Sequence, residues 1–185
     1  MFSNENKKQA DMCRFCWMCR HICPVAGATG SEGWGPRARG LMVSMIERGS
    51  AELDAEIAEA MYHCTMCDAC ANDCETGWKP TDFIREARMY CVANEVAPAA
   101  INTAIDNILT KGNIYGEALN EKLAARIEAL PETADVLVYI GQTGRCFGAD
   151  SAISFLNILD KAKVGYTTLK DEQPTGALLG GMMGQ

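Results

Sequence analysis

The chain has 185 residues and 48% hydrophobic content, enough for one or two small domains with a buried core. Its net charge of −7 argues against a general nucleic-acid surface, and it has no run of about 18 uninterrupted apolar residues that would predict a membrane span. Residues 1–8 show no apolar export segment, which predicts a cytoplasmic setting where thiols stay reduced.

Eight of the ten cysteines form two runs with identical spacing. In each run two residues separate each of the first three cysteines, and three residues precede the fourth. Three closely spaced thiolates suit three corners of an iron–sulfur cube, and the fourth cysteine of such a run typically ligates the other cluster in a two-cluster protein. The first run comprises Cys13, Cys16, Cys19 and Cys23, and the second comprises Cys64, Cys67, Cys70 and Cys74.

This spacing predicts two [4Fe–4S] clusters with crossed ligand sets, and electron transfer as the function. We find no pattern that indicates a general base, a nucleophile or an open metal site, so no catalytic residue and no substrate chemistry are assigned to this chain. The predicted ligands of cluster 1 are Cys13, Cys16, Cys19 and Cys74, and those of cluster 2 are Cys64, Cys67, Cys70 and Cys23.

Two other uses of cysteine were weighed against this prediction. Structural zinc also takes four cysteines, but typically as two separated pairs, and a zinc site does not explain a third cysteine two residues after each pair. Disulfides need an oxidising compartment, which the sequence does not indicate. The spacing therefore favours iron–sulfur clusters over both.

The segment between the runs predicts two helices. Pro36 suits the first turn of a helix whose apolar positions are Leu41, Met42, Met45 and Ile46, and Gly49 ends it. Ser50 is the expected N-cap of the next helix, which carries Leu53, Ile57, Ala60 and Met61. Such a helical insert favours an α-helical ferredoxin module.

After the second run, a helix is expected to open at residues 79–81, with Thr81 as its cap and Phe83, Ile84, Ala87, Met89 and Tyr90 as apolar positions. Two more helices are predicted at 98–110 and 116–130. Residues 136–141 then read as a buried parallel strand, 149–162 as an amphipathic helix and 164–169 as a second strand. Together these three segments predict one βαβ unit, which leaves sheet edges uncovered and must pack on helices, pair with a partner or belong to a longer chain.

Over residues 10–92 the chain resembles heterodisulfide-reductase-type iron–sulfur subunits, the small C subunit of anaerobic glycerol-3-phosphate dehydrogenase and the iron–sulfur subunit of glycolate oxidase. Besides the two runs, the resemblance includes Cys23-Pro24, Pro36-Arg37-Ala38-Arg39-Gly40 and Ile84-Arg85-Glu86-Ala87-Arg88. It implies an α-helical ferredoxin module, a following domain with a Cys-Cys-Gly signature, and a flavoprotein dehydrogenase partner that exchanges electrons with the clusters.

Three positions depart from the family pattern. The second run ends Cys74-Glu75 in place of Cys-Pro, which removes a rigid turn but no ligand. The strand at 136–141 ends Gly141-Gln142 in place of Gly-Cys, and residues 174–176 read Pro-Thr-Gly where the Cys-Cys-Gly signature is expected. Because Gln and Thr are poor iron ligands, we expect this region to be degenerate and kept for structure or docking.

Other residues near the runs have weaker signals. His21 and His63 are expected to support the clusters without ligating them, and Cys91 to be a small buried hydrophobe. Cys146 follows Arg145, a neighbour that lowers a thiol pKa. Two further groups either tune cluster potential or have ordinary surface and packing roles, namely the cations Arg14, Arg20 and Lys79 and the indoles Trp17, Trp34 and Trp78.

Residues 142–148 follow a strand and precede a helix, but they lack the dinucleotide-binding glycine spacing and are read as a loop. The predicted fold is mainly α, with a two-cluster ferredoxin module at 1–95, a helical connector at 96–134 and a partial α/β unit at 135–185. The predicted function is that of an electron-transfer subunit in a hetero-oligomeric oxidoreductase, with a flavoprotein or other redox subunit as partner and peripheral membrane association only through partners. The alternatives are a thiol or heterodisulfide reductase subunit that uses Cys146, a standalone ferredoxin-like carrier, and a zinc scaffold.

Overall fold

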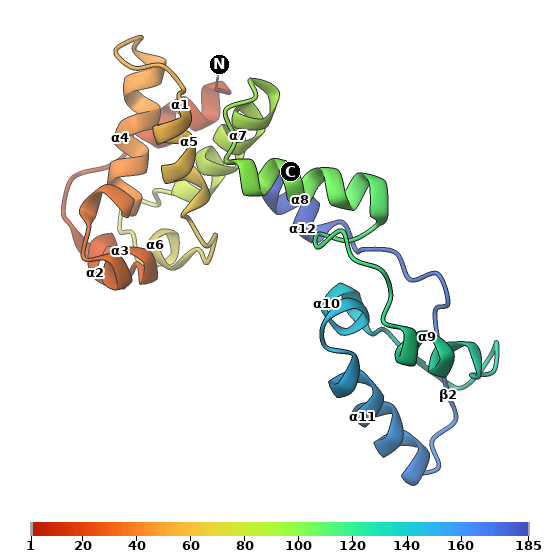
Figure 1. Cartoon of the computed structure of the whole chain (residues 1–185). Coiled ribbons are helices and arrows are strands. Elements are labelled where there is room, and N and C mark those ends of the chain that lie inside the picture. Colours follow the sequence, from red (N-terminus) through yellow and green to blue (C-terminus); the bar gives the residue numbers. More distant parts are fainter. Residues whose placement is uncertain (1, 185) are drawn as a thin grey trace. The chain divides into compact units, whose positions relative to one another are not determined.

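The computed structural model describes residues 2–184 and is mainly helical, as predicted (Figure 1). In the first part of the chain the elements are α1 (Asn4–Asp11), α2 (Met18–Ile22), α3 (Pro24–Thr29), a 3-10 turn η1 (Glu32–Trp34), α4 (Pro36–Glu47), α5 (Ala55–Tyr62), α6 (Ala69–Asn72) and α7 (Pro80–Ala93). The second part contains α8 (Ala99–Lys111), α9 (Glu121–Glu128), β1 (Val136–Val138), α10 (Gly141–Cys146), α11 (Ala149–Lys161), β2 (Tyr166–Thr168) and α12 (Ala177–Met183).

The described residues divide into two compact units. The first runs up to Asn102 and resumes at Leu178, and the second spans Thr103–Ala177. The first unit therefore carries both cysteine runs and most of the final helix α12. The domain limits predicted from the sequence, at residues 95 and 134, do not coincide with this division and stay a prediction.

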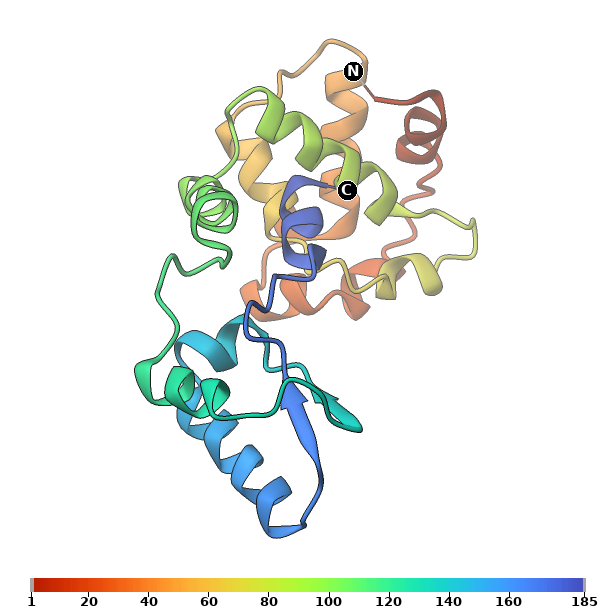
Figure 2. The same ribbon diagram turned by 90° about the vertical axis from the view of Figure 1, so that its right-hand side faces the viewer.

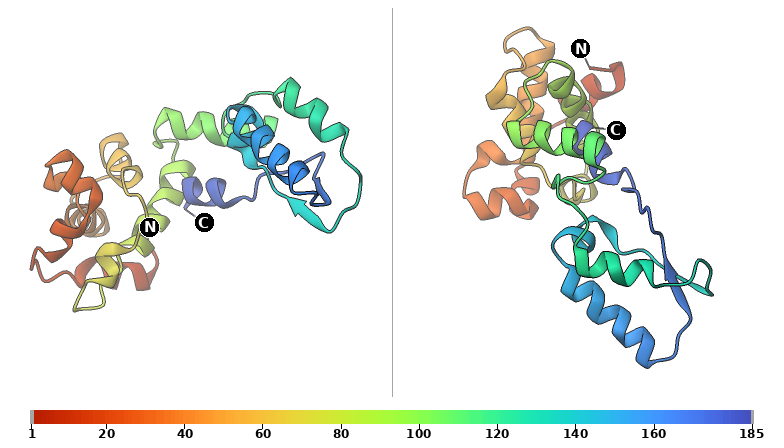
Figure 3. Two further views of the ribbon diagram at one scale, coloured as in Figure 1. Left: turned by 90° about the horizontal axis from the view of Figure 1, so that it is seen from below. Right: turned by 45° about the vertical axis from the view of Figure 1, so that its right-hand side comes forward.

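The core of the first unit lies where α1, α4, α5 and α7 pack together, a group of helices that Figure 3 shows from two directions. Fully buried aromatic and aliphatic side chains fill it, and several cysteines of both runs pack against it. The cysteine runs are thus attached to a rigid helical core, whose central buried residues are Val43, Met61, Trp78, Phe83 and Ile84.

Helix α4 buries only part of the predicted face: Met42 and Ile46 pack against the core as expected. Leu41 and Met45, expected in the core, are exposed, whereas Arg39, Gly40 and Val43 are buried. Apolar periodicity failed here because a charged residue occupies the buried face, and a charge at a core position is rare unless it has a partner. Arg39 Nε donates to the carbonyl of Ala60 at 2.6 Å.

The helix starts also differ from the predictions at two points. The cap of α5 is Asp54, not Ser50, because its carboxylate accepts the N–H of Ile57 at 2.9 Å. Ser50 belongs to the preceding turn, where its hydroxyl donates to the carbonyl of Met45. Thr81 does not cap α7 either: it is buried inside the first turn and donates to Asp68.

The last described segment packs on the first unit. Arg88 of α7 donates to the carbonyl of Gly181 at 2.9 Å, and the hydroxyl of Tyr62 donates to the carbonyl of Met182 at 2.6 Å. Both carbonyls belong to α12, the dark blue helix in Figure 2. Residues far apart in the sequence are therefore held together by side chains of α5 and α7.

In the second unit β1 and β2 pair in parallel, with Val136 opposite Tyr166 and Val138 opposite Thr168. Helices α10 and α11 lie between them in the chain, and α9 and α11 pack around a small apolar core. Tyr166 lies at the boundary of this core, where its hydroxyl donates to Asp160 Oδ1 at 2.9 Å and accepts from Arg126 Nη2 at 2.9 Å. The other fully or nearly buried members are Leu123, Ile127, Ala149 and Leu156.

Two details of the second unit correct the sequence prediction. The first strand ends at Val138 and is not buried: Leu137 is 58% exposed, whereas β2 is buried along its length. The side chains of a strand project from the two faces of its sheet, and in β1 only Val138 packs against the core of this unit, so Val136 and Leu137 stay exposed. The segment expected to be a loop at 142–148 begins as the short helix α10, whose Gln142 accepts the N–H of Ile114.

Candidate metal centres

The two cysteine runs adopt the same strained backbone. In each run the two residues that flank the second cysteine have positive φ. They are Phe15 (56°) and Trp17 (71°) in the first run, and Met66 (56°) and Asp68 (58°) in the second. Non-glycine residues in this region cost about 1–3 kcal/mol each and concentrate at functional sites. Four such residues at equivalent positions therefore mark both loops as built for a purpose other than packing.

The strained turns bring backbone N–H groups onto sulfur. Phe15 donates its N–H to Cys13 Sγ at 3.5 Å, and Met66 donates to Cys64 Sγ at 3.4 Å. Each turn leads straight into a short helix, α2 or α6, that carries the third cysteine. The two runs thus repeat one another in both spacing and conformation.

The fourth cysteines are held differently. Cys23 is the N-cap of α3, with Pro24 in the first turn, and its sulfur accepts the N–H of Ala26 at 3.5 Å. Cys74 has no following proline, and its sulfur lies 3.2 Å from the hydroxyl of Thr76. A backbone bond from Gly77 to the carbonyl of Cys74 closes that turn. Hydrogen bonds therefore fix the turn where the sequence lacks a rigid ring.

Two cavities in the first unit are lined by cysteines. Each combines the first three cysteines of one run with the fourth of the other, and Cys70 lines both, so the cavities adjoin. This grouping supports the crossed ligand sets predicted from the spacing. Cavity 1 contains Cys13, Cys16, Cys19 and Cys74 in its wall, and cavity 2 contains Cys23, Cys64, Cys67 and Cys70.

The thiols also disfavour one another's ionisation, mainly within each cavity and, between Cys19 and Cys70, from one cavity to the other. Burial, and then the charges of Cys13, Cys16 and Cys74, raise the pKa of Cys19 to about 11. Burial, followed by the charges of Cys64, Cys19, Cys67 and Cys23, raises the pKa of Cys70 to about 12. Thiolates crowded in this way need a compensating cation, and metal ligation requires the deprotonated form. A positively charged iron core satisfies that need.

Two other thiols that line the cavities have a lowered pKa. The pKa of Cys67 is lowered, first by the N–H of Ala69 and then by the side chain of Thr65. At Cys74 burial raises the pKa, but the side chain and N–H of Thr76 outweigh it, so that the net pKa is lowered. Each cavity therefore contains at least one thiol that ionises readily.

Each cavity also has a lining residue with an unpaired donor. Among residues 2–184, the buried side-chain nitrogens without a hydrogen-bond partner include Arg39 Nη2 and Trp78 Nε1. Arg39 lines cavity 2 and Trp78 lines cavity 1. Buried donors are nearly always paired, and the sulfurs of an iron–sulfur cluster accept hydrogen bonds. The donors therefore fit a sulfur-bearing group in each cavity.

Residues 9–78 match the family model described as 4Fe-4S dicluster domain. No curated protein and no solved structure matches the chain. The chain holds two [4Fe–4S] clusters. It is thus an iron–sulfur electron carrier, and within the described residues no helix combines the length and apolar character needed to span a bilayer.

The surroundings of cavity 1 are aromatic and partly open. Trp17 is 42% exposed, and the guanidinium of Arg37 lies 3.8 Å from its ring centre. Arg37 also forms an ion pair with Glu32. Arg14 lines the cavity together with the carboxylates Asp73 and Glu75, so positive and negative charges are mixed around it.

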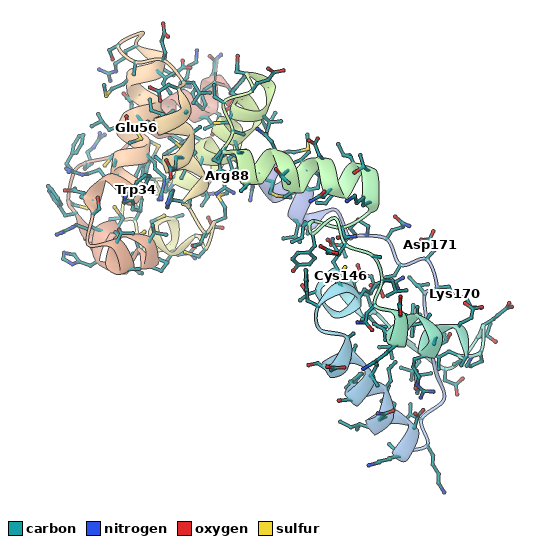
Figure 4. All side chains as sticks on the ribbon, viewed as in Figure 1. Trp34, Glu56, Arg88, Cys146, Lys170 and Asp171 are labelled. Atoms are coloured by element: carbon teal, nitrogen blue, oxygen red, sulfur yellow. The ribbon has the colours of Figure 1, made fainter. Side chains whose placement is uncertain are left out.

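The other residues predicted to tune the clusters are placed differently. Trp34 stacks on the ring of His63 at 4.2 Å, and His63 Nδ1 lies 2.8 Å from the carbonyl of Glu59 (Figure 4 labels Trp34). His21 and Arg20 are exposed, as is Lys79, whose N–H donates to Gln9. The proposal that these residues act on the clusters stays a prediction.

Sequence reasoning missed the two buried arginines next to cavity 2. Arg39 is 1% exposed, and Arg88 is 6% exposed with its Nη2 donating to the carbonyl of Cys64 at 2.6 Å. Both lie in the segments that carry the family resemblance, and Arg39 falls on the helix face of Pro36, Gly40 and Val43. Because Pro36, Arg39, Gly40 and Val43 stand at helix positions i, i+3, i+4 and i+7, they share one face of α4, and this spacing was the available sequence signal that Arg39 lies beside the buried Val43.

Cys91 and Cys146 lie outside both cavities. Cys91 is fully buried beside Ala58 and Ala97, as predicted, and burial raises its pKa to about 11. The pKa of Cys146 is also raised, because burial and the charge of Glu117 outweigh the predicted lowering by Arg145. The guanidinium of Arg145 is engaged elsewhere, with the carbonyls of residues 169 and 170.

Proposed function

We propose that this chain is an electron-transfer subunit of a multi-subunit oxidoreductase. The observation that carries the proposal is the shared wall of the two cavities at Cys70, reinforced by the effect of the Cys19 charge on the pKa of Cys70. Two redox centres in adjoining cavities form a relay. Bound [4Fe–4S] clusters supply one-electron chemistry, and the protein sets potential, insulation and docking.

The proposal includes the crossed ligand sets given above. Helices α2 and α6 hold the third cysteine of each run, and the following turn or helix carries the fourth cysteine into the other cavity. Trp78 and Phe83, both fully buried, keep water from the inner wall beside cavity 1. Cys16 lies in the exposed part of its loop, which leaves an outer side open for electron exchange.

A flavoprotein dehydrogenase is the proposed partner, as the resemblance to heterodisulfide-reductase-type subunits implies. Support comes from apolar side chains that stand exposed around Cys16. Phe15 is 55% exposed and Met18 is 47% exposed, beside the half-exposed Trp17. Exposed aromatic and methionine side chains are enriched at protein interfaces. A partner seated there places its redox group next to cluster 1.

The second unit is proposed to serve docking and not chemistry. Its polar cavity holds one thiol, Cys146, beside Gln142, Arg145 and Glu172. The N–H groups of Ile140 and Gly141 donate to Glu172, next to Gln142, where the subunits that the chain resembles have cysteine. This donor set does not suit an additional iron–sulfur cluster, because iron in such sites is held by several thiolates.

The proposal is tested by anaerobic co-purification followed by a functional measurement. The chain is isolated with its native partners, the complex is examined for flavin absorption, and the dehydrogenase substrate or a chemical reductant of the flavin is added. We expect the visible cluster absorbance to bleach at a rate set by the partner. Reduction by unrelated flavoproteins at equal rates, with the chain monomeric, would favour a standalone carrier.

The thiol-reductase alternative is tested separately. It requires Cys146 as a redox-active group, so a Cys146→Ser variant would lose turnover while keeping its iron content. On the electron-relay proposal the same variant transfers electrons at the wild-type rate. A colourless protein that contains zinc after anaerobic purification would contradict both functions.

A further inference from the structure

Consecutive residues of α4 serve the two cavities. Arg39 lines cavity 2, whereas Gly40 lies against Trp78, which lines cavity 1. Arg39 places a positive charge at cavity 2. Gly40, which has no side chain, leaves space for the uncharged ring of Trp78 at cavity 1. The two cavities therefore differ in their unpaired hydrogen-bond donor: a charged guanidinium on α4 in cavity 2, and a neutral indole packed against α4 in cavity 1.

The charge of Arg39 is buried, and no carboxylate within residues 2–184 forms an ion pair with it. Its Nε donates to the carbonyl of Ala60, a neutral acceptor, and its Nη2 has no partner among residues 2–184. The nearby Arg88 donates to the carbonyls of Met61, Cys64 and Gly181, and its guanidinium lies 5.0 Å from the ring centre of Tyr62. A buried, unpaired guanidinium is costly unless the site supplies negative charge. In cavity 2 that charge comes from the ligand thiolates.

The acidic groups near cavity 2 do not neutralise this pair. Asp68 lines the cavity, but it is exposed and accepts the hydroxyl of Thr81. Cavity 1 has a balanced wall: Arg14 and Arg37 line it together with Asp73 and Glu75, and Arg37 is also paired with Glu32. The local charge is therefore more positive around cavity 2.

We propose that Arg39 donates an N–H···S hydrogen bond to cluster 2 and raises its reduction potential above that of cluster 1. The inference rests on the crossed ligand sets of the proposed function. Adding one electron makes a cluster more negative by one charge, and a buried cation stabilises that reduced state. Identical cysteine ligation allows potentials that differ by hundreds of millivolts, so the surroundings decide the order.

If cluster 2 has the higher reduction potential, one of the two clusters is the preferred site for a stored electron. An electron shared between the clusters resides mainly on cluster 2, and cluster 1, with its exposed rim, exchanges electrons with the partner. Trp78 is the neutral counterpart in cavity 1, because an indole N–H donates a hydrogen bond but carries no charge. Arg39 is a positioning and tuning residue, not a ligand.

The experiment is an EPR-monitored redox titration of the holoprotein. Cys16→Ser and Cys67→Ser variants, each altering a ligand that belongs to only one cluster, assign the two signals. We expect Arg39→Gln to lower the reduction equilibrium constant of cluster 2 at least tenfold, which is about 59 mV for one electron. Cluster 1 shifts far less, and Arg39→Lys, which keeps the charge but loses the fork, gives an intermediate shift.

The matched control is Arg37→Gln, which removes a paired and partly exposed guanidinium next to cavity 1. We expect it to change the potential of cluster 2 by less than a third of the Arg39→Gln effect. Equal shifts of both clusters in Arg39→Gln, or no shift, would overturn the proposal, because a merely structural role of Arg39 does not distinguish between the clusters.

A measurement on the unsubstituted chain keeps the proposal testable even if the variants fold poorly. Protein labelled with guanidino ¹⁵N-arginine is reduced by one electron and examined by pulsed EPR. A ¹⁵N coupling on the cluster 2 signal is expected, and its absence would contradict the hydrogen bond. A wild-type protein with only one cluster would instead overturn the proposed ligand sets, before any question about Arg39 arises.

Discussion

The two cysteine runs share their spacing and their strained turns, yet the cavities they line differ. Cavity 1 has an open rim with Trp17 and Met18, and Arg37, one of its two arginines, is paired with a carboxylate. Cavity 2 faces Arg39, a buried cation that no carboxylate among the described residues neutralises. The comparison teaches that the loops determine which cysteines meet, whereas the surrounding helices determine how the two centres differ.

The largest effect is expected from the cysteine that crosses between the runs. Cys74→Ala should remove cluster 1 and spare cluster 2, because Cys74 lines the cavity of the first run. Iron and sulfide should fall from about eight to about four per chain. Anaerobic analysis and EPR of the reduced variant measure this, with the Cys67→Ser signal as the reference for cluster 2. Loss of the cluster that includes Cys67 would refute the crossing.

A second substitution tests the contact between α4 and cavity 1. A Cβ on Gly40 would lie 2.7 Å from the ring of Trp78, a rigid buried side chain. We expect Gly40→Ala to destabilise the fold by about 1–3 kcal/mol, as overpacking does, and to speed the loss of cluster 1. Thermal unfolding under anaerobic conditions measures both.

The control for this substitution is Gly27→Ala in α3, where nothing lies within 4 Å of the added carbon. It should leave stability unchanged or slightly raised, because alanine favours a helix. If both alanine variants lose the same stability, the Gly40 effect does not come from Trp78.

A smaller effect is expected at the start of α5. Asp54→Ala removes the cap of the helix that leads to the second run, at a cost of about 1 kcal/mol. Ser50→Ala, at the position the sequence pattern favoured, should cost less, because Ser50 makes a single bond in the preceding turn. Denaturant unfolding of the two variants side by side decides between the caps.

The smallest effect concerns the two thiols that are not ligands. Because the pKa of Cys91 is raised to about 11, its thiol stays protonated below that pH, and the folded protein also buries it fully. Iodoacetamide at about pH 8.5, near the ordinary thiol pKa, should therefore leave Cys91 unmodified and react slowly with the half-buried Cys146. Mass spectrometry of the holoprotein checks this, and equal labelling of both would contradict it.

The cysteine spacing predicted the cofactors correctly because ligand geometry is local, with three cysteines brought together by one turn. Helix positions also followed from local signals such as Pro36 and Pro80, each of which opens a helix. The burial of Arg39 was not predictable from hydrophobicity, since its acceptor, the carbonyl of Ala60, and the cysteines of its cavity come from other segments. The exposure of β1 likewise depends on which elements cover the faces of its sheet, a non-local fact.

The chain leaves the first unit at Asn102 and returns to it at Leu178. In topological terms the second unit is an insertion into the iron–sulfur unit, and the returning segment is part of the host. A truncated chain that ends at Asn102 would lack the carbonyls of Gly181 and Met182, to which Arg88 and Tyr62 donate hydrogen bonds. Because Arg88 also donates to the carbonyl of Cys64, one side chain connects α12 to the loop that carries the proposed ligands of cluster 2.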